Sequence, residues 1–240
     1  MTLVTIKTRD GECPAYLSRP AGSGPWPGVL VYMDAIGIRP AMLELGERLA
    51  TYGYVVMLPD VYYRGGPYEP MTHATFRDPE LRKRLREPAT PENVMSDTRA
   101  FIDYLNAQPD VQRGGIGTTG YCMGGNLSLR AAGTYPEHVA LAASFHGGFL
   151  ATDAPDSPHR LAPKVRAHVY VAGAIEDESF TDEMKTRLEN ALTEAGVDHT
   201  IETYPAKHGW CLPDSPAYDA AAAERHWQTM TAFFDAKLRR

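Results

Sequence analysis

Cysteine is scarce in this sequence of 240 residues, which contains only Cys13, Cys122 and Cys211. Their separations match no metal-binding pattern, and three thiols cannot all pair within one chain. The eight histidines include no His-Glu-x-x-His motif. We therefore expect free thiols in a reducing compartment, and neither a metal nor another cofactor.

Long apolar runs are absent as well. No stretch approaches the roughly 18 consecutive apolar residues that a membrane-spanning helix needs. The opening residues, MTLVTIKTRDGE, lack the apolar centre and the small-residue cleavage site of a signal peptide. We therefore expect a cytoplasmic protein that does not enter a membrane.

No charge of one sign dominates the chain. The 30 acidic and 24 basic side chains are interspersed, and the formal net charge is −6. This balance argues against nucleic acid or an anionic membrane as a partner. The basic run LRKRLRE at residues 81–87 has acidic neighbours, and we expect it to be a solvated helix face rather than a binding patch.

Segments with the pattern of buried strands alternate with helical segments along most of the chain. Residues 29–34, VLVYMD, are apolar at consecutive positions, as a strand buried on both faces requires. The alternation predicts an α/β fold with a mostly parallel, doubly wound sheet and helices on both faces. No linker, repeat or low-complexity segment divides the chain, so we expect one domain over residues 1–240. The expected strands cover residues 29–34, 54–60, 115–122, 139–148, 166–173 and 199–205, and the expected helices cover residues 40–53, 78–92, 93–108, 124–135, 183–196 and 220–238.

The stretch GTTGYCMGGN at residues 117–126 places Cys122 between Gly120 and Gly124, after a predicted strand and before a predicted helix. This order matches the Gly-x-Ser-x-Gly nucleophile elbow of α/β-hydrolases, with a thiol in place of the hydroxyl. The carboxyl ends of strands are where doubly wound sheets place their sites, and N–H groups at a helix start favour a thiolate. The alternative is a small buried cysteine in a glycine-rich turn.

Two more residues follow Cys122 in the order of an α/β-hydrolase triad. Asp177 comes just after the strand HVYVAG, and His208 comes just after the strand TIETY. A nucleophile, an acid and a histidine, each after a strand, predict a Cys-His-Asp triad. Glu176 and Glu178 are adjacent alternatives for the acid.

Each member of the predicted triad has a chemical role. Cys122 attacks an ester or lactone carbonyl and forms a thioester. His208 accepts the thiol proton and then activates water, while Asp177 orients the imidazole. The backbone N–H groups of Ala35 and Met123 are the expected oxyanion donors, because this fold uses the residue after the nucleophile and a loop after an early strand.

The sequence resembles the dienelactone hydrolases, also called carboxymethylenebutenolidases, from about residue 13 to residue 238. GYCMGG is similar to that family's nucleophile motif, EDESF to its acid loop, KHGWC to its histidine loop, and LPDVYYR to a segment with a substrate-binding arginine. The resemblance implies an α/β-hydrolase fold, a Cys-His-Asp triad and hydrolysis of small esters or lactones without a cofactor. It also implies that Arg64 binds a substrate carboxylate; a surface salt bridge is the alternative.

Two positions depart from the family's pattern. Asp34 stands where the family has a glutamate that meets the resting thiol, so Asp34 is expected either to tune Cys122 or to cap the following helix. The family's second arginine, after the histidine, has no counterpart, and Trp210 and Cys211 stand in that region. We expect Trp210 either to line an apolar substrate pocket or to pack structurally, and His146 in SFHGG to be structural.

The predicted function is therefore a thiol-dependent hydrolase that acts on a small ester or lactone, with a modest preference for substrates that bear a carboxylate. Two other classes of function stay open at this point. One is a thiol redox protein in which Cys122 and Cys211 react together. The other is a non-catalytic binding protein on a hydrolase fold.

Overall fold

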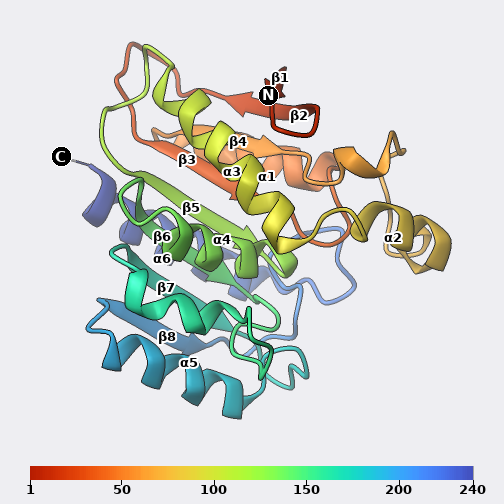
Figure 1. The fold of residues 1–240 in the computed structure, drawn as a ribbon, viewed down its shortest axis with the longest axis vertical. Helices are drawn as coiled ribbons and strands as arrows, with labels where there is room; N and C mark the ends of the chain where they lie inside the picture. Colours follow the sequence, from red (N-terminus) through yellow and green to blue (C-terminus); the bar gives the residue numbers. More distant parts are fainter. Residues whose placement is uncertain (240) are drawn as a thin grey trace.

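The computed structural model describes residues 1–239 and contains an eight-stranded sheet covered by helices (Figure 1). The strand order is β1-β2-β4-β3-β5-β6-β7-β8. The first two strands form an antiparallel hairpin, β2 is antiparallel to β4, and all other neighbours are parallel. The predicted α/β fold with a mostly parallel sheet is confirmed. The strands are β1 Thr2–Lys7, β2 Glu12–Ser18, β3 Gly28–Tyr32, β4 Val55–Pro59, β5 Ile116–Tyr121, β6 Val139–Phe145, β7 His168–Gly173 and β8 His199–Thr203.

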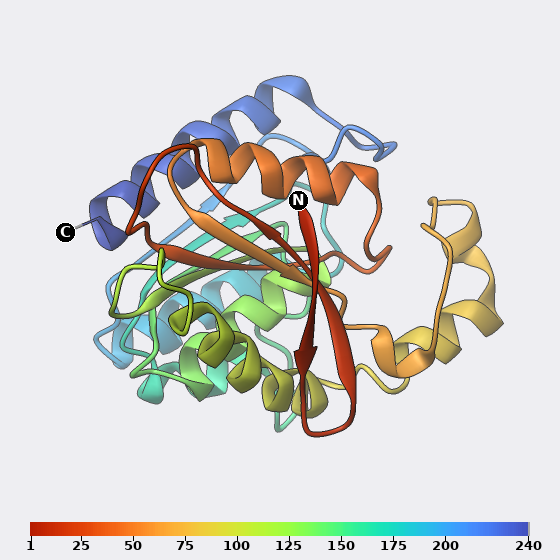
Figure 2. The same cartoon turned by 90° about the horizontal axis from the view of Figure 1, so that it is seen from above.

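Helices cover both faces of this sheet. Figure 2 shows α1 and α6 on one face and α3, α4 and α5 on the other. Every residue of β3, β4 and β5 is buried, which explains why these strands are not alternately polar and apolar. The helices are α1 Pro40–Thr51, α2 Pro79–Arg86, α3 Pro91–Asn106, α4 Met123–Thr134, α5 Asp182–Glu194 and α6 Ala220–Leu238, and short 3-10 turns occur at η1 Tyr63–Gly65, η2 Thr75–Arg77 and η3 Pro158–Lys164.

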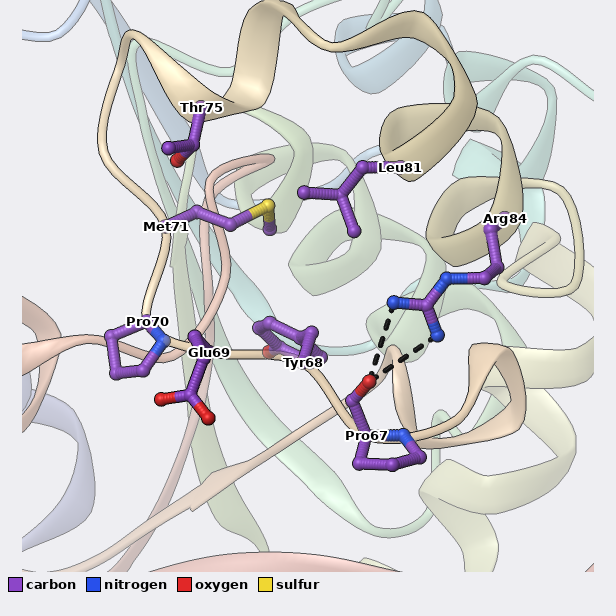
Figure 3. A pocket seen from close by; sticks show the side chains of 8 residues that line it. All are labelled: Pro67, Tyr68, Glu69, Pro70, Met71, Thr75, Leu81 and Arg84. Carbon is purple, nitrogen blue, oxygen red and sulfur yellow. Dashed lines mark hydrogen bonds between the residues drawn. The ribbon is translucent and has the colours of Figure 1, made fainter.

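Residues 60–90 connect β4 to α3 and form an arm that contains α2 (Figure 2). Proline stands in the first turn of both α2 and α3, and the side chains of Asp78 and Thr90 cap these two helices. In the basic run of α2, only Leu85 is buried, so most of this run faces solvent, and Arg86 also lines a cavity. The arm encloses a cavity of about 500 Å³. Figure 3 shows its lining side chains, among which Arg84 donates hydrogen bonds to the carbonyl of Pro67.

The ends of the strands position the site. Cys122 follows β5, Asp177 follows β7 and His208 follows β8. Because β5, β6, β7 and β8 are parallel neighbours, their carboxyl ends lie at one edge of the sheet. Within the described residues, no helix is long and apolar enough to cross a membrane.

Candidate active site

Cys122 lies in a strained turn between β5 and α4. Its backbone has φ 53° and ψ −114°, a conformation that side-chain-bearing residues rarely adopt. A Cβ atom at Gly120 would lie 2.1 Å from the carbonyl oxygen of Gly124, and one at Gly124 would lie 2.2 Å from the carbonyl oxygen of Tyr32. Both glycines are therefore needed for the sharp turn, which has the geometry of a nucleophile elbow.

His208 and Asp177 meet beside this turn. The Nδ1 atom of His208 lies 2.8 Å from Oδ2 of Asp177. The other oxygen of Asp177 accepts hydrogen bonds from the backbone N–H and the hydroxyl of Ser179, at 2.9 and 2.6 Å. Glu176 instead forms an ion pair with Lys207. The structure therefore joins Asp177 to His208, rather than either adjacent glutamate.

The surroundings favour the charged form of His208. Burial lowers the pKa of this imidazole, but hydrogen bonds to Asp177 and Cys122 outweigh it and raise the pKa to about 10. Burial acts against the charge on Asp177 too, yet the hydrogen bonds from His208 and Ser179 lower its pKa below the ordinary value. The structure therefore favours an imidazolium at His208, next to Cys122.

Ala35 and Met123, the expected oxyanion donors, lie on the wall of the same cavity as Cys122. Within residues 1–239, neither backbone N–H donates a hydrogen bond to a protein acceptor. The hydroxyl of Tyr62 donates to the carbonyl oxygen of Ala35 at 2.9 Å, which holds the peptide that follows Ala35. Two free N–H groups beside a nucleophile are what a developing oxyanion requires.

The cavity around Cys122 has a volume of about 830 Å³. The triad residues and both expected oxyanion donors line it, and the arm of residues 60–90 closes one side. Its walls carry apolar side chains and two arginines, most of which the sequence analysis did not single out. These additional lining residues include Phe76, Arg86, Asn126, Leu127, Arg130 and Phe149.

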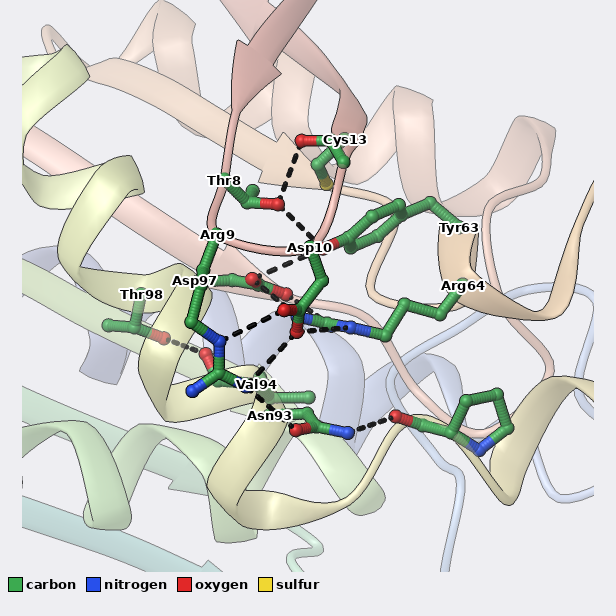
Figure 4. Close-up of polar contacts among 12 residues, drawn as sticks. Thr8, Arg9, Asp10, Cys13, Tyr63, Arg64, Asn93, Val94, Asp97 and Thr98 are labelled. Carbon is green, nitrogen blue, oxygen red and sulfur yellow. Dashed lines mark hydrogen bonds and ion pairs between the residues drawn. The ribbon is translucent and has the colours of Figure 1, made fainter.

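Arg64, which was expected either to bind a substrate carboxylate or to form a salt bridge, does not line this cavity. Its guanidinium donates to both oxygens of Asp97, at 2.6 and 2.8 Å, and to Asp10 at 2.8 Å (Figure 4). Asp97 is completely buried, and the Arg64 side chain is 9% exposed. With both faces of its fork occupied by carboxylates, Arg64 joins the β1–β2 turn to α3.

Asp34 and Trp210 also lie outside the cavity wall. Asp34 binds Arg39 through both carboxylate oxygens, at 2.8 and 2.9 Å. It does not cap α1 either, because the residue before that helix is Arg39. Trp210 is fully buried and stacks on Tyr204, with ring centroids 5.0 Å apart. Both side chains therefore pack against partners only five and six positions away in the sequence, and neither faces the cavity.

His146 packs against His208. Its ring centroid lies 4.9 Å from that of His208 and 5.0 Å from that of Trp210. The side chain is 1% exposed, and burial lowers the pKa of its imidazole well below the ordinary value. A neutral, packed ring agrees with the structural role that we expected for His146.

Two polar residues near the triad escaped the sequence analysis. Ser179 holds Asp177, and the pattern Asp-x-Ser, typical of turns in which a carboxylate binds the backbone two residues later, was the available signal. Asn126 donates to the carbonyl oxygens of Gly148 and Phe149, at 3.1 and 3.0 Å. Its position one turn after Cys122 on α4 was a second signal.

None of the three cysteines forms a disulfide bond in the described residues. Cys13, Cys122 and Cys211 are all free thiols, and Cys13 and Cys211 are buried. In the described part of the chain, no group of three or more histidine, cysteine or acidic side chains could hold a metal ion.

Comparison with known proteins shows the family of this chain. The model of the dienelactone hydrolase family matches residues 13–238. A Synechocystis protein named "Putative carboxymethylenebutenolidase" is 30% identical over 99% of this chain and 97% of its own length. The carboxymethylenebutenolidase of Pseudomonas sp. strain P51 is 28% identical over 88% of this chain and 85% of its own.

Solved structures show the same relationship. A crystal structure described as a "Putative Dienelactone Hydrolase" from Klebsiella pneumoniae superimposes with a TM-score of 0.85, at 25% identity and with 97% of each chain covered. The shared fold is the α/β-hydrolase fold. Since the family match spans nearly the whole chain, this protein belongs to the dienelactone hydrolase family and is a homologue of carboxymethylenebutenolidases.

Proposed function

We propose that this protein hydrolyses small esters or lactones through a triad of Cys122, His208 and Asp177, with a thioester intermediate. The observation that carries the proposal is the His208–Asp177 hydrogen bond of 2.8 Å beside the strained Cys122 turn. The raised pKa of His208 supports it, because an imidazolium is the partner that a nucleophilic thiolate needs.

Acylation is the first half of the reaction. The Cys122 thiolate attacks the substrate carbonyl carbon, and the N–H groups of Ala35 and Met123 donate to the developing oxyanion. The carbon–oxygen bond to the leaving group then breaks, and His208 gives its proton to the departing oxygen. The products are a thioester on Cys122 and an alcohol, which stays attached to the acyl group when the substrate is a lactone.

Deacylation restores the enzyme. Neutral His208 takes a proton from water as the water oxygen attacks the thioester carbonyl. The carbon–sulfur bond breaks, so the acid leaves and Cys122 is again a thiolate beside an imidazolium. Asp177 keeps the Nδ1 position protonated throughout, which directs Nε2 of His208 toward the reacting atoms.

The cavity supports a small organic substrate. Phe76, Leu127 and Phe149 provide apolar walls, and Arg86 and Arg130 provide positive charge. We propose that these two arginines, rather than Arg64, produce the preference for carboxylate-bearing esters or lactones. The names of the relatives agree with lactone hydrolysis as the reaction.

The test is hydrolysis of p-nitrophenyl acetate and of a five-membered unsaturated lactone by purified protein. Cys122→Ala should abolish turnover of both, and the wild-type protein should carry an acyl group on Cys122 in mass spectra after brief mixing. Cys211→Ala is the matched control, because Cys211 is buried and does not line the cavity. Undiminished turnover by Cys122→Ala would refute the proposed nucleophile.

A further inference from the structure

A second cavity adjoins the catalytic one. It has a volume of about 640 Å³ and lies between the start of α3, the end of α4 and residues 155–161. Thr90, Pro91 and Arg130 line both cavities. Because the two spaces share these residues, Arg130 stands at their junction.

One face of α4 leads from the nucleophile to this junction. Cys122, Asn126 and Arg130 follow one another at intervals of four residues, and all three line the catalytic cavity. Two helical turns separate Cys122 from Arg130 along the backbone, about 12 Å. The Nε atom of Arg130 donates to Oδ1 of Asn126 at 2.7 Å, so this side of the guanidinium faces the residue that lies between it and Cys122 on the helix.

The charge of Arg130 is poorly compensated compared with that of the other buried arginines. Arg39 and Arg64 are each bound by two carboxylates. Arg130 has one carboxylate partner, Asp156, at 3.2 Å, and that aspartate is 64% exposed while the Arg130 side chain is only 12% exposed. A buried cation with a single, solvated partner gains more than the others from a further anion.

The pKa values agree with this difference. Burial lowers the pKa of Arg130 and its pair with Asp156 does not offset the effect. In Arg39 and Arg64, burial acts in the same direction, but hydrogen bonds to carboxylates outweigh it and the pKa rises above the ordinary value. Among these three arginines, Arg130 is therefore the one whose positive charge the protein's own carboxylates stabilise least.

We propose that Arg130 binds a carboxylate at the far end of an elongated substrate whose reactive carbonyl lies at Cys122. The inference rests on the proposed function and specifies its substrate class: an ester or lactone with an anionic group one to two helical turns from the scissile carbonyl, about 5–11 Å. The guanidinium fork matches a carboxylate. Glu92 and Asp156 line the second cavity, and the guanidinium of Arg160, which lines it as well, donates to the backbone carbonyls of Ala154 and Asp153. We therefore place the anion at the junction, and any longer tail extends into the second cavity.

The test uses p-nitrophenyl monoesters of dicarboxylic acids from succinic to suberic acid, each compared with its uncharged methyl diester. For the wild-type protein, the ratio of kcat/KM for acid over diester should rise as the chain becomes long enough to reach Arg130. Arg130→Met should lower that ratio about 10- to 100-fold for the preferred length, and Arg130→Lys should retain part of it. A parallel series of acetate esters of ω-hydroxy acids places the carboxylate on the leaving group, which shows on which side of the scissile bond the tail lies.

Arg166→Met is the matched control for the loss of one positive charge, because Arg166 lies outside both cavities, is 68% exposed and pairs with Glu137. It should leave the ratio unchanged. The proposal is overturned if the wild-type ratio is independent of chain length in both series, or if Arg130→Met lowers kcat/KM equally for acids and diesters.

A binding experiment separates this inference from the proposed function. Cys122→Ala removes the nucleophile, so calorimetry can measure binding of the monoanilides of the same dicarboxylic acids without turnover. The longer acids should bind more tightly than their methyl esters, and adding Arg130→Met should remove the difference. If the wild-type protein hydrolyses no ester, the proposed function fails, while this experiment still decides whether Arg130 binds the carboxylate; equal binding of acid and methyl ester would refute it.

Discussion

At the scale of single residues, the pKa of His208 is the property of the site that the fold changes strongly. Its pKa is raised to about 10 although burial alone would lower it. The two groups responsible, Asp177 and Cys122, come from different strand ends, so the shift exists only in the folded protein. It links the charge of the active site to the stability of the whole chain.

The stabilisation that His208 provides should depend on pH. A histidine whose pKa is higher in the folded state stabilises that state fully below its unfolded pKa of about 6.5, and this contribution is lost as the pH rises through the folded value. We therefore expect the free energy of unfolding of the wild type to exceed that of His208→Gln most at pH 6, and the difference to shrink between pH 7 and about pH 10. Urea denaturation of both proteins at pH 6, 8 and 10 measures it. A difference that grows with pH would contradict the assigned pair.

Asp177 should matter more for catalysis than the acids beside it. Asp177→Asn keeps the size of the side chain but favours the wrong imidazole tautomer, so kcat for p-nitrophenyl acetate should fall, by up to about 10⁴-fold in related triads. Glu178→Gln is the matched control and should retain most of the activity. If Glu178→Gln were the more damaging substitution, Asp177 would not be the triad's acid.

At the scale of secondary-structure elements, Arg64 connects segments that are distant in the sequence. The β1–β2 turn contributes Asp10, η1 contributes Arg64 and α3 contributes Asp97 (Figure 4). Thr8 and Tyr63 join the same cluster through a hydroxyl–hydroxyl hydrogen bond of 2.7 Å. The arginine thus ties the edge hairpin to the helical layer.

Arg64→Met should therefore reduce stability rather than substrate preference. It leaves Asp97 buried without its cation, which costs about 3–5 kcal/mol for buried pairs. Arg9→Met is the control, because Arg9 pairs with the same Asp10 but is 60% exposed, and exposed pairs contribute about 0–1 kcal/mol. Chemical denaturation measures both, beside kcat/KM for charged and neutral esters. If Arg64→Met had normal stability but had lost the preference for acids, Arg64 would bind the substrate after all.

At the scale of the whole molecule, one hydrophobic cluster runs through the sheet and its helices. It includes residues from Ile6 on β1 to Leu238 on α6. The sheet order places the N-terminal hairpin at one edge and β8 at the other, so this cluster joins segments from the full length of the described chain. We propose on this basis that residues 1–240 form one domain.

A single domain should unfold in one cooperative transition. The three tryptophans report on the loop before β3 (Trp26), the loop after β8 (Trp210) and α6 (Trp227), whereas far-ultraviolet circular dichroism reports on all helices. We expect the urea midpoints from fluorescence and circular dichroism to coincide. Two resolved transitions, or midpoints that differ between the probes, would show that the chain folds as more than one unit.

Much of the fold, and the positions of Cys122, Asp177 and His208 at the ends of their strands, could be predicted because the signals are local. Consecutive apolar residues predicted β3 and β4, and the glycines around Cys122 predicted the turn. Asp177 and His208 were recognised because each comes shortly after a strand. In parallel sheets, that position alone brings side chains to a common edge.

The sequence by itself determined where strands, helices and the sharp turn form, since burial patterns and backbone sterics act over a few residues. Only the tertiary structure decided which partner each charged side chain meets. Arg64 binds carboxylates 54 and 33 positions away, so its sequence neighbours could not reveal that its guanidinium is occupied. Arg130 is the opposite case, because its guanidinium is not fully occupied. It is buried at the junction of two cavities and has a single carboxylate partner. The physical reason is that electrostatic pairing depends on distances in space, which chain order does not specify.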